Sequence, residues 1–259
     1  APSFIVDFSY PKIISQLRSL GFDKVVELSF GAKMVNREYH KKLKNSKGLV
    51  IASVCPGIVE TIGKSFPKYK KNLIQVNSPM MAMAKICKKT YPKHKIVFIS
   101  PCNFKKIEAQ KSKNIDAVLD YNELKCILAK NKFRSKKSKG KVLFDKFYND
   151  YTKIYPVAGG LSKTAHLKKI LKDDEMRTIG GIKDVLKFLE NPDKNVKFLD
   201  VNFCKGSCIG GPCVSSRLPL KMRRRKVLNY LKKAKREDIP ETKKGLVGKA
   251  KEISFVSKN

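Results

Sequence analysis

Apolar residues follow two patterns that alternate along the chain. Short runs rich in valine, isoleucine and phenylalanine indicate strands, and apolar residues at a helical period indicate helices. The predicted strands are 4–7, 24–29, 49–53, 95–100, 117–120 and 197–203. The predicted helices are 11–20, 33–43, 58–64, 80–90, 122–129, 162–171, 182–190 and 220–235. Because strands alternate with helices, we expect an α/β fold of two lobes with parallel sheets flanked by helices.

Length and composition are those of a folded protein. The chain has 259 residues, of which 42% are hydrophobic, enough for one large core or two smaller ones. No apolar run reaches the roughly 18 residues of a membrane span, and there is no apolar signal stretch. Seven cysteines are an odd number, which favours a reducing cytoplasm over a disulfide framework. The start without methionine suggests a domain excised from a longer protein.

The net charge of +35 suits an anionic partner, such as nucleic acid, an acidic electron carrier or an anionic membrane surface. Much of this charge is lysine dispersed over predicted helix faces, so nucleic-acid binding is not expected. The most basic stretches are 130–141, a predicted insertion or exposed loop, and 223–226, predicted to lie on an amphipathic helix. Strong salt-dependent binding to DNA would be needed to support a nucleic-acid function.

Four cysteines stand where a predicted strand ends or in the loop that follows it. They are Cys55, Cys102, Cys204 and Cys208. In open α/β sheets, ligands bind beyond the carboxyl ends of strands, so these thiols could face one crevice. The last two belong to Cys204-Lys-Gly-Ser-Cys208-Ile-Gly-Gly-Pro, whose glycines would let the backbone approach a bulky inorganic ligand. Four thiolates suit a cubane, so the pattern predicts an iron-sulfur site.

Zinc is the rival metal, because four thiolates suit it equally well. Zinc sites usually use two close pairs of cysteines, and this chain has only one such pair. The remaining cysteines have other interpretations. Cys87 and Cys126 lie in predicted helices and are expected to act as small hydrophobic residues. Cys213 stays open between the two roles.

Three segments resemble the cluster-binding motifs of [FeFe]-hydrogenase catalytic domains, in the same order. They are 49–67, which begins Leu-Val-Ile-Ala-Ser-Val-Cys-Pro-Gly, then 97–109, which contains Ser-Pro-Cys-Asn-Phe-Lys-Lys, and 203–212. The resemblance covers 1–235 and implies one H-cluster domain of two interleaved α/β lobes, with a boundary near 142–160. We expect 236–259 to be a polar C-terminal tail or linker.

The resemblance implies a composite cofactor between the lobes. The four cysteines would hold a [4Fe-4S] cluster, and the Cys208 sulfur would also bridge to a diiron subcluster that carries CO and cyanide, which completes the H-cluster. Lys105 matches the lysine that hydrogen-bonds a cyanide ligand, a strong charge-assisted bond in a dry pocket. Pro2, Ser3 and Pro79 match the loops that line the cluster. The implied partners are H₂, a ferredoxin-like electron donor or acceptor, which can be a domain of the same full-length chain, and hydrogenase maturation proteins.

The sequence departs from active members of that family around the diiron unit. Val54 stands where they carry a thiol that relays protons, and Tyr39 and Lys42 fall where the relay carboxylates are expected. Positions that usually hold Met, Gln and Met are here Ser100, Met80 and Asn202.

These departures predict a function in which binding persists and turnover is slow, because a positioned proton-transfer group contributes about 10² to 10⁴ in rate. The leading hypothesis is therefore hydrogen sensing or slow interconversion of H₂ and protons, as in the sensory branch of the family. The alternative is an iron-sulfur scaffold or assembly factor that holds only a [4Fe-4S] cluster. Hydrogenase-like proteins of cytosolic cluster biogenesis also lack the relay cysteine.

Overall fold

The computed structural model describes residues 1–131 and 142–257. Its strands form two parallel sheets. In the first sheet, β5 (Phe198–Asn202) lies between β1 (Val50–Ile51) and β4 (Met176–Gly180). In the second sheet, β2 (Val97–Ser100) pairs with β3 (Ala117–Asp120). Since parallel neighbours need a crossover, the helices cover the faces of these sheets.

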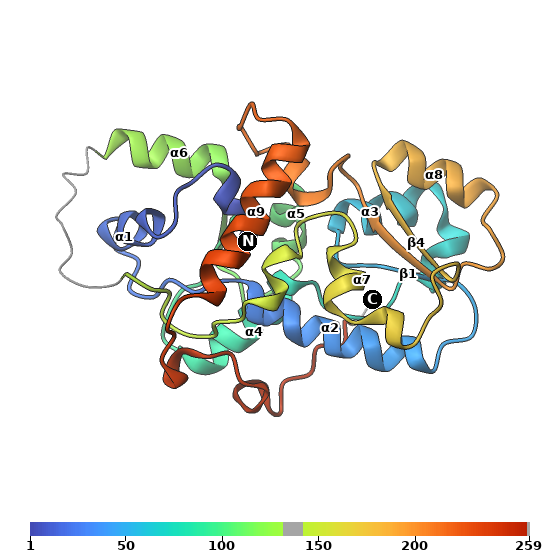
Figure 1. The fold of residues 1–259 in the computed structure, drawn as a ribbon, viewed down its shortest axis with the longest axis horizontal. Coiled ribbons are helices and arrows are strands. Elements are labelled where there is room, and N and C mark those ends of the chain that lie inside the picture. Colours follow the sequence, from blue (N-terminus) through green and yellow to red (C-terminus); the bar gives the residue numbers. More distant parts are fainter. Residues whose placement is uncertain (132–141, 258–259) are drawn as a thin grey trace.

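The helices divide between two ends of the molecule (Figure 1). Helices α3 and α8 lie with the first sheet at one end, α1, α6 and α9 lie toward the other, and α2 and α4 lie side by side between them. Their bounds are α1 Lys12–Ser19, α2 Ser29–Lys44, α3 Pro56–Ser65, α4 Pro79–Thr90, α5 Phe104–Gln110, α6 Tyr121–Lys130, α7 Gly160–Thr164, α8 Ile182–Glu190 and α9 Leu220–Lys235.

Two main hydrophobic cores correspond to the two ends. The first core packs α2, α3, α8 and the first sheet together through side chains such as Phe30, Ile58 and Phe198. The second joins α1, α6 and α9 through side chains such as Ile14 and Val227. The residues of both cores are buried, and the burial of their apolar surface is the main stabilising term of the fold. The predicted α/β architecture of parallel sheets flanked by helices is therefore confirmed.

Most predicted elements are present, and two predicted strands are wrong. Residues 4–7 belong to a 3₁₀ helix, Pro2–Val6, whose proline has its φ fixed at the first turn. Residues 24–28 are not part of a strand, because their backbone bonds to a loop: Val25 N donates to the Asp145 carboxylate at 2.6 Å.

The helix predicted over 162–171 is broken. Helix α7 ends at Thr164, and His166 takes a left-handed conformation with φ of 54°, after which only a 3₁₀ turn continues. Strand β4 and helix α5 were not predicted at all.

The last described segment, 236–257, was expected to be a polar tail or linker, and it packs onto the first core. Ala250 and Phe255 are buried there. The carbonyl of Phe255 accepts a hydrogen bond from Asn77 N at 2.8 Å. These buried apolar side chains and this backbone hydrogen bond attach the segment to the first core.

Two further predictions concern a basic stretch and membrane-spanning helices. The basic stretch predicted at 130–141 lies almost wholly outside the described residues. Within the described part of the chain, no helix has both the length and the apolar character that a membrane crossing requires.

Candidate metal centre

The four predicted cysteines follow strands of both sheets in the chain. Cys55 follows β1 and precedes α3, whose first residue is Pro56. Cys204 and Cys208 follow β5, the neighbour of β1 in the same parallel sheet. Cys102 follows β2, in the other sheet. Because parallel strands end at a common edge, the sequence brings Cys55 and Cys204 to one side, and the second sheet adds Cys102.

One pocket collects most of the predicted site. Cys55, Cys102 and Cys208 line it, and so does Lys105. The pocket wall also contains the predicted residues Pro2 and Pro79, together with Val54, Met80 and Asn202. Two predicted residues lie outside this wall. Cys204 does not line the pocket, although its thiol interacts electrostatically with those of Cys102 and Cys55. Ser3 is fully buried, and its hydroxyl bonds to the Tyr121 hydroxyl at 2.7 Å.

Burial, followed by the charge of neighbouring thiols, raises the pKa of Cys204 and Cys208 and so favours their neutral form. Burial raises the pKa of Cys204 to about 12, and the neighbouring thiols of Cys102 and Cys55 raise it as well. Burial, then Cys55 and Cys102, raise the pKa of Cys208 to about 12, against the opposing charge of Lys105. Cys208 is exposed by its accessible area although it lies deep in the protein, as expected for a side chain that borders a cavity. Metal binding here requires proton release.

Among the described residues, no three His, Cys, Asp or Glu side chains converge closely enough to hold a single metal ion. Three of the four thiols line a pocket, and the fourth, Cys204, interacts with Cys102 and Cys55 through charge. Four thiolates are the donor set of a cubane.

Helix α5 places Lys105 beside the loop of the first thiol. Its ammonium donates to Glu108 Oε2 at 2.6 Å and to the Val54 carbonyl at 3.5 Å. The Lys105 side chain is only 14% exposed. A cation in this position favours anionic ligands in the pocket, since the low local dielectric strengthens charge-assisted hydrogen bonds.

The glycines after Cys208 lie against protein backbone. A Cβ atom on Gly211 would lie 2.6 Å from the Pro101 carbonyl oxygen, and one on Gly210 would clash with the Lys205 carbonyl oxygen. They let the loop approach protein backbone, including the Cys102 loop. Cys213 also serves this contact, because its N–H donates to the Pro101 oxygen at 3.2 Å and its thiol to Asn103 Oδ1 at 3.0 Å.

Tyr39 and Ser100 shape the loops that carry the first two thiols. The fully buried Tyr39 hydroxyl accepts a hydrogen bond from Ser53 N at 2.8 Å, just before Val54 and Cys55. Ser100 Oγ accepts from Cys102 N at 3.1 Å and donates to the Cys102 carbonyl at 3.0 Å. Both residues therefore support the backbone of the site.

Two polar residues of the pocket wall were not predicted. Asp200, on β5, is buried and accepts from Ser162 Oγ at 2.7 Å and Ser162 N at 3.1 Å. Burial raises the pKa of the Asp200 carboxyl. Its signal in the sequence was an acidic residue inside an apolar strand run. Tyr155 lines the pocket from the end of a 3₁₀ turn, in a region without a predicted element.

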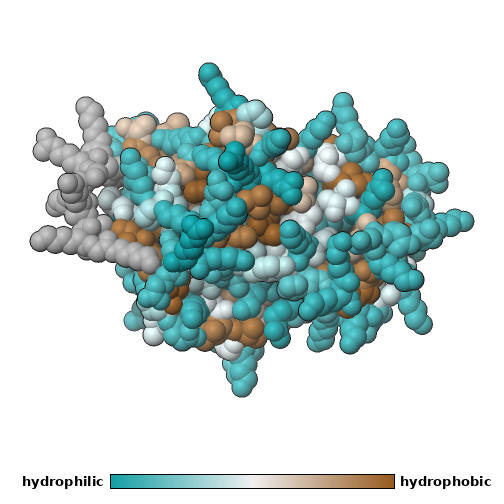
Figure 2. Space-filling view, in the orientation of Figure 1, coloured by the Kyte–Doolittle hydropathy of each residue, from teal (hydrophilic) through white to brown (hydrophobic). Residues whose placement is uncertain are grey.

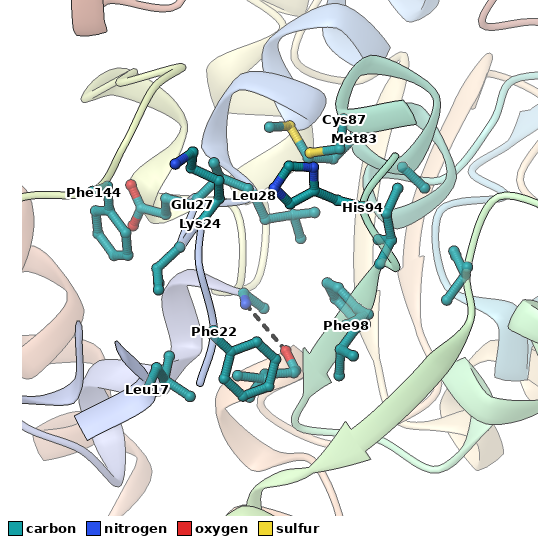
Figure 3. Close-up of a pocket in the computed structure, with 18 of the residues that line it drawn as sticks. Leu17, Phe22, Lys24, Glu27, Leu28, Met83, Cys87, His94, Phe98 and Phe144 are labelled. Atoms are coloured by element: carbon teal, nitrogen blue, oxygen red, sulfur yellow. Dashed lines mark hydrogen bonds between the residues drawn. The ribbon is translucent and has the colours of Figure 1, made fainter. Parts of the chain in front are cut away.

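A larger cavity of about 430 Å³ adjoins this pocket and lacks the four thiols (Figure 3). Its wall is mainly apolar, with Phe22, Met83 and Phe98 around the space, and Glu27 and His94 among its few polar residues. The two spaces share Leu28, Met80 and Phe98 in their walls. Three of the four thiols and Lys105 line the smaller pocket, so that pocket is the candidate metal centre.

The fold and this site agree with the sequence family. The sequence profile "Iron only hydrogenase large subunit, C-terminal domain" matches residues 1–212. The chain therefore belongs to the iron-only hydrogenase family, which confirms the family predicted from the motifs.

Two curated relatives match parts of the chain. Iron hydrogenase 1 of Clostridium pasteurianum is 26% identical over 256 residues, which cover 77% of this chain and 44% of that protein. The cytosolic Fe-S cluster assembly factor NAR1 of Kluyveromyces lactis is 28% identical over 111 residues, or 40% of this chain and 24% of that protein. The chain thus spans less than half the length of these relatives.

Solved structures share the fold. [FeFe]-hydrogenase HydA(deltaEFG), from a study of stepwise H-cluster assembly, has a TM-score of 0.63 at 17% identity and covers 95% of this chain and 82% of that one. A variant of [FeFe]-hydrogenase HydA1 from Chlamydomonas reinhardtii has a TM-score of 0.64 at 16% identity, with the same coverage. At this identity, the likeness establishes the architecture.

Proposed function

We propose that this chain binds a [4Fe-4S] cluster through Cys55, Cys102, Cys204 and Cys208, and that a diiron subcluster with CO and cyanide ligands joins it at Cys208. The proposed role is hydrogen sensing or slow interconversion of H₂ and protons. The observation that carries the proposal is the shared pocket, in which thiols from two different sheets meet beside a buried lysine.

The cofactor and the residues of the pocket have separate proposed roles. When bound, the cluster would supply electron transfer, and the diiron unit would supply the site for hydrogen. Lys105 donates hydrogen bonds toward an anionic ligand, and its contacts with Glu108 and the Val54 carbonyl fix its position. Pro79 and Met80, at the start of α4, line the wall and exclude water. Excluding water strengthens each electrostatic contact in the pocket.

Slow turnover is proposed because the wall offers no proton carrier at the position of the relay thiol. Val54 lines the pocket with an aliphatic side chain. The Tyr39 hydroxyl accepts a hydrogen bond from Ser53 N, next to Val54 in the chain. Burial raises the Tyr39 pKa above its ordinary value. A phenol held in this way does not replace a carboxylate as a proton acceptor.

A scaffold that holds only the [4Fe-4S] cluster is the second candidate. The similarity to the cluster assembly factor NAR1 favours it, although that similarity covers only 40% of this chain. Both candidates use the same four thiols and differ in whether a diiron unit is installed.

The proposed partners follow from the first candidate. A ferredoxin-like protein or domain would exchange electrons, and maturation proteins would install the diiron unit. A reducing compartment such as the cytoplasm suits the seven cysteines, all of which are free thiols.

The test is anaerobic reconstitution with iron and sulfide, followed by a synthetic diiron precursor and infrared spectroscopy. We expect iron and sulfide near the ratio of one cubane, and CO and cyanide bands that shift under hydrogen. Cys102→Ser should lower the iron content, and Cys126→Ser, at an exposed thiol on α6, is the matched control.

The possible results distinguish the two candidate functions and can refute the proposed site. A cubane signal without CO and cyanide bands would establish the scaffold. Zinc bound in preference to the cluster, or iron binding that is equal in both variants, would refute the proposed site.

A further inference from the structure

We propose that the Tyr155 hydroxyl donates a hydrogen bond to the ligand held in the cysteine pocket. This inference rests on the proposed function, because it assumes a cluster in that pocket. Tyr155 lines the pocket together with Cys55, Cys102 and Cys208. Within the described residues, its hydroxyl oxygen is buried and has no hydrogen-bond partner, and no other such side-chain atom belongs to a residue of this wall.

An unpartnered buried hydroxyl is costly. Removing a polar group from water without a new partner is destabilising, so native proteins seldom retain one without a reason. Two polar side chains of the wall have partners, because Lys105 bonds to Glu108 and the Asp200 carboxylate accepts from Ser162. The Tyr155 hydroxyl is a buried, neutral donor of this wall without a partner among the described residues, so it is available to a ligand.

The protonation state of Tyr155 makes it a donor. Burial raises the Tyr155 pKa far above its ordinary value, and the nearby Tyr39, Asp200 and Cys208 raise it further. A neutral phenol carries one O–H donor. The acceptor must be an atom with a lone pair or negative charge, such as a cluster sulfide or a diatomic ligand on iron.

The backbone around Tyr155 is held firmly, which positions the donor in advance. Its N–H donates to the Thr152 carbonyl at 3.0 Å. Gly160, the first residue of α7, packs against the same turn. A Cβ atom on Gly160 would lie 2.7 Å from the Tyr155 carbonyl oxygen. A donor held in this way loses little freedom when the ligand binds.

The decisive variant is Tyr155→Phe, which removes only the hydroxyl. In metal-free protein, we expect thermal stability to be unchanged or raised, because an unpartnered polar group is removed. In reconstituted protein, we expect a more negative cubane reduction potential or shifted CO and cyanide bands, because a hydrogen bond to the ligand is lost.

The matched control is Tyr230→Phe, at another buried tyrosine whose hydroxyl donates to Glu27 Oε1 at 2.8 Å and which does not line the pocket. It should lower the stability of the metal-free protein and leave the spectra and the potential unchanged. Incorporation of 3-fluorotyrosine at position 155 keeps a hydroxyl that is a stronger donor, so it should shift the same bands in the direction opposite to Tyr155→Phe.

The outcomes separate the two proposals. Wild type and Tyr155→Phe could bind equal amounts of iron and have the same infrared bands and reduction potential. The hydroxyl would then make no hydrogen bond to the ligand, and this inference would be overturned while the iron-sulfur function stands. If wild type binds no iron, both proposals fail.

Discussion

Val54 is the residue with the largest expected effect on rate. It lies next to Cys55 and faces the pocket, where an aliphatic side chain has no exchangeable proton. The loop around it is well supported, because Tyr39 holds Ser53. A cysteine at position 54 should therefore place its thiol in the pocket wall without changing the backbone of this loop.

Val54→Cys should raise the rate of hydrogen production in diiron-loaded protein. A positioned acid or base contributes about 10² to 10⁴ in rate, and we expect the lower part of that range because Tyr39 and Lys42 still interrupt the outward path. The measurement is hydrogen evolution with a reduced dye, normalised to the intensity of the infrared bands. Val59→Cys is the control, since Val59 packs against the first core and does not line the pocket. Equal rates at equal loading would contradict the relay argument.

A buried ion pair joins elements of both hydrophobic cores. Lys153 contacts Glu27 through a close charge-assisted hydrogen bond, and both side chains are almost fully buried. Tyr230, on α9, donates to Glu27 at 2.8 Å and accepts from Lys153 Nζ at 3.1 Å. Ser29, the first residue of α2, donates to the same carboxylate at 3.0 Å. The pair thus ties α9, the 3₁₀ turn before Tyr155 and α2 together.

Lys153→Met should lower the free energy of unfolding by about 3–5 kcal/mol, because it leaves the Glu27 charge buried without its partner. Urea unfolding monitored by circular dichroism measures the change. Lys168→Met is the control, because the pair of Lys168 with Asp173 is exposed to solvent on both sides and should contribute little. In the double variant with Glu27→Gln, part of the loss should be recovered. A loss no larger than that of the control would show that the pair is dispensable.

Hydrophilic side chains cover most of the molecular face in Figure 2, and hydrophobic patches lie between them. The chain has 57 Lys and Arg residues against 22 Asp and Glu. Many acidic groups are already paired with lysines, as Asp120 and Glu123 are with Lys106. The net charge of +35 leaves a strong excess of positive charge.

Association with an acidic ferredoxin should therefore depend on salt. Electrostatic steering raises association rate constants by about 10- to 10³-fold, and salt screens it over a Debye length of about 10 Å at 0.1 M. Stopped-flow electron transfer at increasing NaCl concentrations should show a steep fall in the second-order rate constant. A small neutral reductant is the control and should show little change. An equally flat salt dependence for the ferredoxin would mean that the charge does not guide this partner.

Much of the site was predictable from the sequence because its signals are local. The runs before Cys55, Cys102 and Cys204 are strands β1, β2 and β5, and strand ends in parallel sheets point to one edge. Helices α8 and α9 have their predicted bounds because their apolar period is regular. The role of Lys105 in the pocket came from the motif, since α5 itself was not predicted.

Other features depend on residues far apart in the chain. Residues 24–28 read as a strand but bond to Asp145, which is 120 residues away from Val25. The polar segment 236–257 is fixed by Phe255 against the first core. The absence of a partner for the Tyr155 hydroxyl is visible only once its surroundings are assembled.

The sequence by itself therefore determined the alternation of strands and helices and the family, and it singled out the four candidate thiols, because these depend on near neighbours and on motif spacing. The tertiary structure decided which polar groups are paired, which glycines contact backbone and which walls the pocket has. Those properties depend on packing between distant segments, which no local pattern contains.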